Sequence, residues 1–129
     1  MKIAWIDNRY DQESNWGYIS SLCSFLKKYD LSNKINIEKD QERFEKKFGC
    51  LNNYQNLILH AGIRDKGETL NRIKTQTPEL KIYLLSSKPE DYKLNEMGEC
   101  PIYEVEYIDG IPPKESKLVI LLKNLAEEN

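Results

Sequence analysis

The sequence is poor in the residues that metal and redox sites need. It contains one histidine, His60, and three cysteines, Cys23, Cys50 and Cys100, which are odd in number and widely spaced. No Cys-x-x-Cys pair and no cysteine–histidine spacing typical of a zinc site occurs. The sequence therefore predicts reduced thiols, with Cys23 packed on a helix face, and neither a disulfide framework nor a metal cluster.

Long apolar runs and an excess of charge are missing as well. No run approaches the roughly 18 apolar residues that a membrane span needs, and the segment MKIAWID lacks the features of a secretory signal. The chain has 19 basic and 21 acidic residues and a net charge of −2. This balance gives no general attraction to nucleic acid or to an anionic membrane. We therefore expect a cytoplasmic protein with no nucleic-acid or membrane partner.

Three motifs of cofactor-binding proteins and enzymes are absent. Residues 7–17, DNRYDQESNWG, lack the GxGxxG spacing of dinucleotide-binding proteins and the Ser/Thr-rich cradle of a flavin phosphate site. The GxSxG nucleophile elbow is missing from the chain. These absences predict no nucleotide or flavin cofactor and argue against an enzyme.

What the sequence does contain is a regular alternation of strand and helix patterns. The expected strands lie at 2–7, 34–38, 57–60, 81–87 and 101–108, and the expected helices begin near Ser14, Asp40, Gly67, Pro89 and Pro113. A length of 129 residues predicts one domain, residues 1–129. Strict alternation favours a parallel sheet with helices on both faces, because right-handed crossovers leave few other topologies. We predict a flavodoxin-like (βα)5 three-layer sandwich with strand order 2-1-3-4-5.

Local signals refine this pattern. Ser14 and Asp40 are candidate N-caps, and Gly49 supplies a left-handed helix end. The first helix should bury an apolar stripe, formed by Ile19, Leu22, Cys23 and Leu26. Trp5 should lie in the core and Trp16 close to it.

Polar residues follow the predicted strands at their carboxyl ends. Asp7 and Asn8 follow the first strand, His60 ends the third, Ser86 ends the fourth, and Glu106 lies near the end of the fifth. In open parallel sheets, ligands and catalytic groups collect at this edge, where the first and third strands diverge. These five residues are therefore the candidate site.

The length, the element order and these strand-end positions resemble a receiver domain of two-component response regulators over essentially the whole chain. Such domains hold Mg²⁺ with an acidic pair after strand 1 and accept a phosphoryl group on an aspartate that ends strand 3. A hydroxyl after strand 4 and a lysine after strand 5 bind the phosphoryl oxygens. The resemblance assigns Asp7 to the acidic pair and Ser86 to the hydroxyl. It also implies that Asn8, His60 and Glu106 replace the second acid, the acceptor and the lysine.

The replacements predict a degenerate phosphorylation pocket. Mg²⁺ favours hard oxygen ligands in an octahedral shell, and only Asp7 would remain as a charged ligand. Glu106 would repel the phosphoryl charge that a lysine neutralises. We therefore expect no aspartyl phosphorylation, no retained Mg²⁺ at Asp7 and no other cofactor.

The resemblance then implies a stand-alone signalling or regulatory domain that acts through protein–protein interaction, with another signalling protein or with a second copy. Receiver domains commonly dock through the face formed by helix 4, strand 5 and helix 5. Tyr103 and Tyr107 alternate along the predicted edge strand and are the candidate partner-binding residues, since aromatic residues are enriched at interfaces. The alternative is that these rings pack under the last helix.

Several readings of the site stay open. A small-molecule binder or an enzyme could reuse Asp7, Asn8, His60 and Ser86. His60 could be a partly buried, hydrogen-bonded imidazole, or a pH-responsive partner of Asp7 or Glu106. It could also join Asp7 in a metal site, be phosphorylated, or act as a general base. Asp7 could instead be structural, and cap a helix or pair with Arg9.

Overall fold

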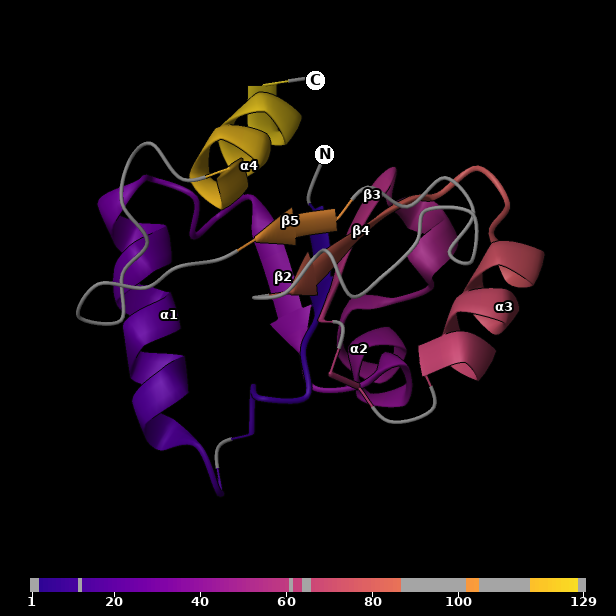
Figure 1. Ribbon diagram of the computed structural model, residues 1–129, viewed down its shortest axis with the longest axis horizontal. Coiled ribbons are helices and arrows are strands. Elements are labelled where there is room, and N and C mark those ends of the chain that lie inside the picture. The colour runs from indigo at the N-terminus through magenta and orange to yellow at the C-terminus, as the bar shows by residue number, and fades with distance from the viewer. Residues whose placement is uncertain are drawn as a thin grey trace.

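The computed structural model describes residues 3–11, 13–60, 62–63, 66–86, 102–104 and 117–127. Within them, strands and helices alternate along the chain (Figure 1). The elements are β1 (Ile3–Ile6), α1 (Trp16–Lys28), β2 (Ile35–Glu38), α2 (Gln41–Phe48), the 3-10 helix η1 (Leu51–Asn53), β3 (Asn56–His60), α3 (Lys66–Gln76), β4 (Lys81–Ser86), β5 (Ile102–Glu104) and α4 (Lys117–Glu127).

A parallel sheet forms the middle of the fold. Its main strands follow the order β2-β1-β3-β4, and each neighbouring pair is parallel. The prediction of an α/β fold with this order is therefore confirmed. Beyond β4, the three residues of β5 pair in parallel with 84–86. The remainder of the predicted fifth strand and the helix predicted near Pro89 lie outside the described residues.

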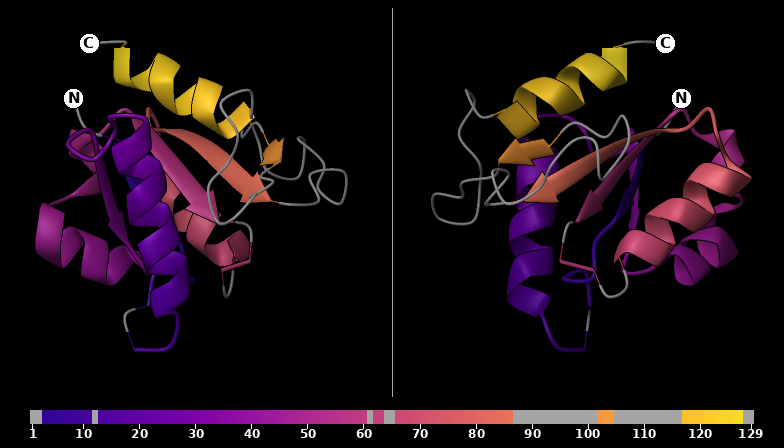
Figure 2. Two further views of the ribbon diagram at one scale, coloured as in Figure 1. Left: turned by 90° about the vertical axis from the view of Figure 1, so that its left-hand side faces the viewer. Right: turned by 45° about the vertical axis from the view of Figure 1, so that its right-hand side comes forward.

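Helices cover both faces of the sheet because the strands are apolar on both sides. The four residues of β1 are all buried, and they alternate between two apolar clusters. Ile3 and Trp5 join the cluster under α1 and α4, whereas Ala4 and Ile6 join the cluster under α2 and α3. Figure 2 shows the same division, with α1 and α4 on one side of the sheet and α2 and α3 on the other.

The boundaries of α2 follow the predicted local signals. The Asp40 carboxylate accepts a hydrogen bond from the backbone N–H of Arg43 at 2.7 Å, as an N-cap does. Gly49 ends the helix with a φ of 94°, which side chains with a Cβ rarely adopt. Both predictions for this helix are confirmed.

Two predictions for α1 are wrong. Asn15, not Ser14, stands at the N-cap, and its side chain makes no capping bond. The side chain of Ser14 hydrogen-bonds Asp11 in the preceding loop instead. Cys23 is exposed, and Phe25 takes its place in the buried stripe. When a helix can bury only one of two side chains, burial of the larger apolar area is favoured. Here that side chain is the phenyl ring of Phe25, not the thiol of Cys23.

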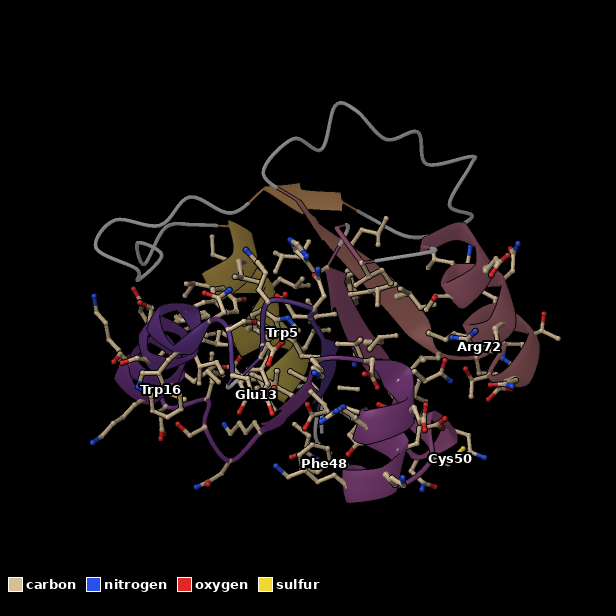
Figure 3. All side chains as sticks on the ribbon, turned by 90° about the horizontal axis from the view of Figure 1, so that it is seen from below. Trp5, Glu13, Trp16, Phe48, Cys50 and Arg72 are labelled. Carbon is tan, nitrogen blue, oxygen red and sulfur yellow. The ribbon has the colours of Figure 1, made fainter. Side chains whose placement is uncertain are left out.

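The two tryptophans have opposite environments. Trp5 is completely buried, as predicted. Trp16 is 65% exposed, so the prediction that it lies near the core is wrong. Figure 3 shows Trp5 in the interior and Trp16 at the periphery of α1. Trp16 occupies the first helical position, where the chain enters α1 from the loop, and its side chain misses the buried stripe.

Among the described residues, no helix has the length and apolar character needed to cross a bilayer.

Candidate functional site at the carboxyl ends of β1 and β3

Two neighbouring strands bring the polar residues together. In the parallel register of β1 and β3, Ile6 pairs with Leu59, so the next residues, Asp7 and His60, leave the sheet side by side. The strand arrow of β2 points to the lower edge in Figure 1, so the parallel strands end there, and Figure 3 views that edge from below. Seven residues form what we call the strand-end cluster: Trp5, Asp7, Asn8, Arg9, Tyr18, His60 and Gly62.

Asp7 is the centre of the cluster. Its side chain is fully buried. Oδ1 accepts hydrogen bonds from the backbone N–H and the Nε of Arg9, at 3.0 and 2.9 Å. Oδ2 accepts from Arg9 Nη2 at 2.7 Å, from the Tyr18 hydroxyl at 2.8 Å and from the Trp5 indole at 3.3 Å. A carboxylate offers about four lone-pair sites, so these five donors use its accepting capacity.

The charge of this buried carboxylate depends on Arg9. Burial by itself would raise the pKa of Asp7, because desolvation disfavours the ionised form. The hydrogen bonds and positive charge of Arg9, with a smaller contribution from His60, outweigh burial and bring the pKa below its ordinary value. Asp7 is therefore ionised at neutral pH and paired with a cation from its own chain.

Arg9 is held on two sides. Its Nε and Nη2 form a bidentate pair with the two oxygens of Asp7, which is the strongest geometry for such a pair. The guanidinium carbon also lies 4.4 Å from the centre of the Tyr18 ring, within range of a cation–π interaction. The Arg9 side chain is 29% exposed and that of Asp7 is 0% exposed, so Arg9 lies between the carboxylate and solvent.

His60 joins the two strand ends through Asn8. Its Nδ1 lies 2.8 Å from Asn8 Oδ1 and 3.7 Å from Asp7 Oδ1. Because Asn8 Nδ2 donates to the Gly62 carbonyl, Asn8 Oδ1 faces the ring as an acceptor. We therefore assign the proton of the neutral imidazole to Nδ1. Burial lowers the pKa of His60; Asp7 opposes this effect and Arg9 adds to it.

Gly62 packs against the imidazole ring. A Cβ added at this glycine would lie 2.7 Å from His60 Cε1, closer than nonbonded carbon atoms come. The position therefore requires glycine for close approach as long as His60 keeps its place.

The structure tests the predicted site in part. Asp7, Asn8 and His60 lie together, and the alternative in which Asp7 pairs with Arg9 is realised. The backbone of Ser86 ends β4, one residue beyond the partner of His60. Glu106 and Tyr107 lie outside the described residues, and only the backbone of Tyr103 is described, in β5. Their roles stay predictions.

Sequence reasoning missed Trp5 and Tyr18 as parts of the site. Tyr18 comes from the first turn of α1, and no local spacing relates it to Asp7. Trp5 faces the core, and its contact with Asp7 follows from their i, i+2 positions on one face of the chain. That alternation was the one signal in the sequence that could have placed the indole beside the carboxylate.

In the described part of the chain, no group of three or more histidine, cysteine or acidic side chains is placed to hold a metal ion. The metal site considered for Asp7 and His60 therefore has no third histidine, cysteine or acidic ligand among these residues. The five donors on Asp7 also leave it without a lone pair for a metal.

Comparison with known proteins gives no family. No protein-family model matches the chain, and the search of curated proteins gives no match.

Proposed function

We propose that this chain is an atypical receiver-like regulatory domain of flavodoxin-like (βα)5 topology, with β5 completing a sheet of order 2-1-3-4-5. In this proposal it acts by binding another signalling protein or a second copy, and aspartyl phosphorylation does not control it. The observation that carries the proposal is the commitment of the Asp7 carboxylate to Arg9, Tyr18 and Trp5.

A divalent cation at Asp7 would have to displace Arg9. The guanidinium already supplies the positive charge that the buried carboxylate needs. Removing one partner from a buried ion pair costs about 3–5 kcal/mol. Mg²⁺ would recover little of this cost, because Asn8 and His60 offer no second carboxylate and the ion prefers an octahedral set of oxygens.

The acceptor position also argues against aspartyl phosphorylation. An acyl phosphate needs a carboxylate oxygen as nucleophile, and β3 ends in an imidazole. The Nδ1 atom of that imidazole is engaged by Asn8. In the cluster, hydrogen bonds within the chain therefore take the place of a bound ion and a phosphoryl acceptor. We propose that the signalling state of the domain does not depend on phosphoryl transfer.

Two exposed apolar side chains support a role in protein binding. In the described part of the chain, the large hydrophobic side chains that are exposed are Trp16 on α1 and Ile120 on α4, at 65% and 50%. Both helices cover the same face of the sheet. Tryptophan is enriched among residues that dominate binding energy at interfaces. Tyr103 and Tyr107 remain candidates for the same role.

The test of the site is an NMR titration with Mg²⁺ and beryllofluoride, a mimic of the phosphoryl group. We expect the signals of Asp7, Asn8 and His60 to stay unchanged, and acetyl phosphate to leave the intact mass unchanged. The matched control is a triple variant, Asn8→Asp, Arg9→Ala and His60→Asp, which restores the missing carboxylates and removes the blocking cation. If the signals of the unmodified chain shift at micromolar concentrations of Mg²⁺ and beryllofluoride, the proposal is contradicted.

One observation favours the second candidate, a small-molecule binder. The His60 side chain is 19% exposed, and its Nε2 has no partner among the described residues. A ligand present at 100 times its dissociation constant would raise the free energy of unfolding by about 2.7 kcal/mol. Thermal denaturation with a panel of small anions and metabolites would detect it, and loss of the shift in His60→Gln would assign it to this site.

A further inference from the structure

We infer that His60 is a proton-operated latch: the neutral ring joins the ends of β1 and β3, and the protonated ring leaves the strand-end cluster for solvent. The inference deepens the proposed function, on which it rests, by adding a form of regulation to the same site. It needs no phosphoryl group, metal or second protein.

In the neutral state, the ring is the central part of a bridge. Asn8, which follows β1, accepts from His60 Nδ1 at the end of β3 and donates to the Gly62 carbonyl just beyond it. The imidazole edge lies directly against Gly62. The last backbone pair between β1 and β3 is Ile6 with Leu59. Beyond it, the two strand ends are connected by these side chains.

The second proton would enter at Nε2, which has no acceptor among the described residues. About four-fifths of the side chain is out of contact with water, since 19% is exposed. A cation there is costly unless a counter-charge compensates for the lost hydration. The counter-charge within the described part of the chain is Asp7, 3.7 Å away, and Arg9 already neutralises it.

Among the residues that the structure describes, the groups around His60 do not change this balance. From the segment after β1, the charged groups that act on the ring are Asp7 and Arg9, and they oppose each other in their effect on it. From α1, the nearby titratable group is Tyr18, which donates to Asp7. From β4, Leu85 pairs with His60 and is apolar. The lowered pKa of His60 agrees with a site that disfavours the charged ring.

A short path to water exists. Gly62 is exposed, and it lies against Cε1, the atom between the two ring nitrogens. Rotation of the side chain past this glycine hydrates the imidazolium without disturbing the Asp7–Arg9 pair. Since His60 is the only histidine of the chain, its titration can be followed without overlap from another imidazole.

The experiment is a pH titration of the full chain by NMR, from about pH 8 to about pH 5, the range in which histidine changes charge. Three readouts are followed: the ring nitrogens of His60, the side-chain amide of Asn8, and the nuclear Overhauser effect between His60 Hε1 and Gly62 Hα. We expect the Overhauser effect to be lost and the Asn8 amide to shift, both with the midpoint of the ring. The Trp5 indole N–H, bonded to Asp7, should stay unchanged and so exclude unfolding.

His60→Gln is the matched control, because glutamine keeps a polar side chain and does not titrate. In this variant the Asn8 and Gly62 signals should be independent of pH. A protonated ring that keeps its Overhauser effect to Gly62 would overturn the inference, as would an Asn8 amide that does not follow the ring. Such a result would leave the proposed function standing, because the beryllofluoride titration reports on Asp7 independently.

Discussion

Arg9 supplies, from two residues along the same chain, the positive charge that the buried Asp7 carboxylate requires. This pairing decides what the site can do, because the oxygens of Asp7 are the only carboxylate oxygens described in the cluster. Because Arg9 neutralises them within the chain, we propose that the site does not depend on a bound cation.

Replacing Arg9 by alanine should therefore destabilise the fold strongly. The variant leaves a fully buried carboxylate without its cation, and we expect a loss of about 3 kcal/mol in the free energy of unfolding. Arg9→Lys should cost less, because it keeps the charge and loses the bidentate geometry. Urea denaturation measures both. Equal stability of the alanine variant and the unmodified chain would show that Asp7 is solvated or protonated in solution.

The pKa of His60 predicts how stability changes with pH. Burial lowers the pKa in the folded chain, so the unfolded chain binds the proton first as the pH falls below about 6.5. The free energy of unfolding should therefore decrease as the pH falls from about 7 to about 5, and this part of the decrease should be missing in His60→Gln. Parallel pH profiles of the two proteins, measured by urea denaturation, would contradict the assignment.

Asp7 contributes in a lower pH range. Its pKa is lowered in the folded chain, so its contribution is present above the unfolded value of about 3.9 and is lost as the pH falls through the lower folded value. The effects of the two residues are thus separated along the pH axis.

At the scale of elements, the described part of the connection between β3 and α3 holds Gly62 close to the ring of His60. Gly62→Ala would place a Cβ 2.7 Å from His60 Cε1, so the ring has to move and its bond to Asn8 should weaken. We expect a loss of about 1–2 kcal/mol, as for other overpacked sites, together with a shifted Asn8 side-chain amide in NMR spectra.

Gly67→Ala is the control for this substitution. Gly67 lies in the first turn of α3 with no atom within 4 Å of an added Cβ. Alanine favours the helix, so this variant should gain up to about 1 kcal/mol. If urea denaturation shows the same change in the free energy of unfolding for both variants, the contact between Gly62 and His60 does not determine the stability of Gly62→Ala.

At the scale of the whole molecule, the exposed Trp16 tests self-association. If a second copy docks on the face of α1, sedimentation velocity should show an average mass that rises with concentration. Trp16→Ala should then weaken the dimer about thirtyfold, the equivalent of about 2 kcal/mol for a central interface residue. Ser20→Ala, on the exposed side of the same helix, is the matched control. A monomer at every concentration would direct the search to a different partner.

The predictable parts of the fold are those that residues close together in the sequence determine. The alternation of apolar runs and helical stripes predicted the order of the elements, and Asp40 and Gly49 predicted the ends of α2. Ser14 shows the limit of such signals, because a competing bond to Asp11 removed it from its expected capping role. Trp16 shows the same limit for burial, since its orientation depends on how α1 docks on the sheet.

The sequence by itself predicted the parallel sheet and its main strand order, because alternating strand and helix patterns joined by right-handed crossovers leave few topologies. It also predicted the meeting of Asp7 with His60, because both residues follow strands that are neighbours in that order. Only the tertiary structure decided what these residues do to each other. Arg9 turns back on Asp7, Tyr18 reaches it from α1, and Asn8 and Gly62 enclose His60. Such contacts depend on distances between side chains from different elements, and these are established only when the helices pack on the sheet.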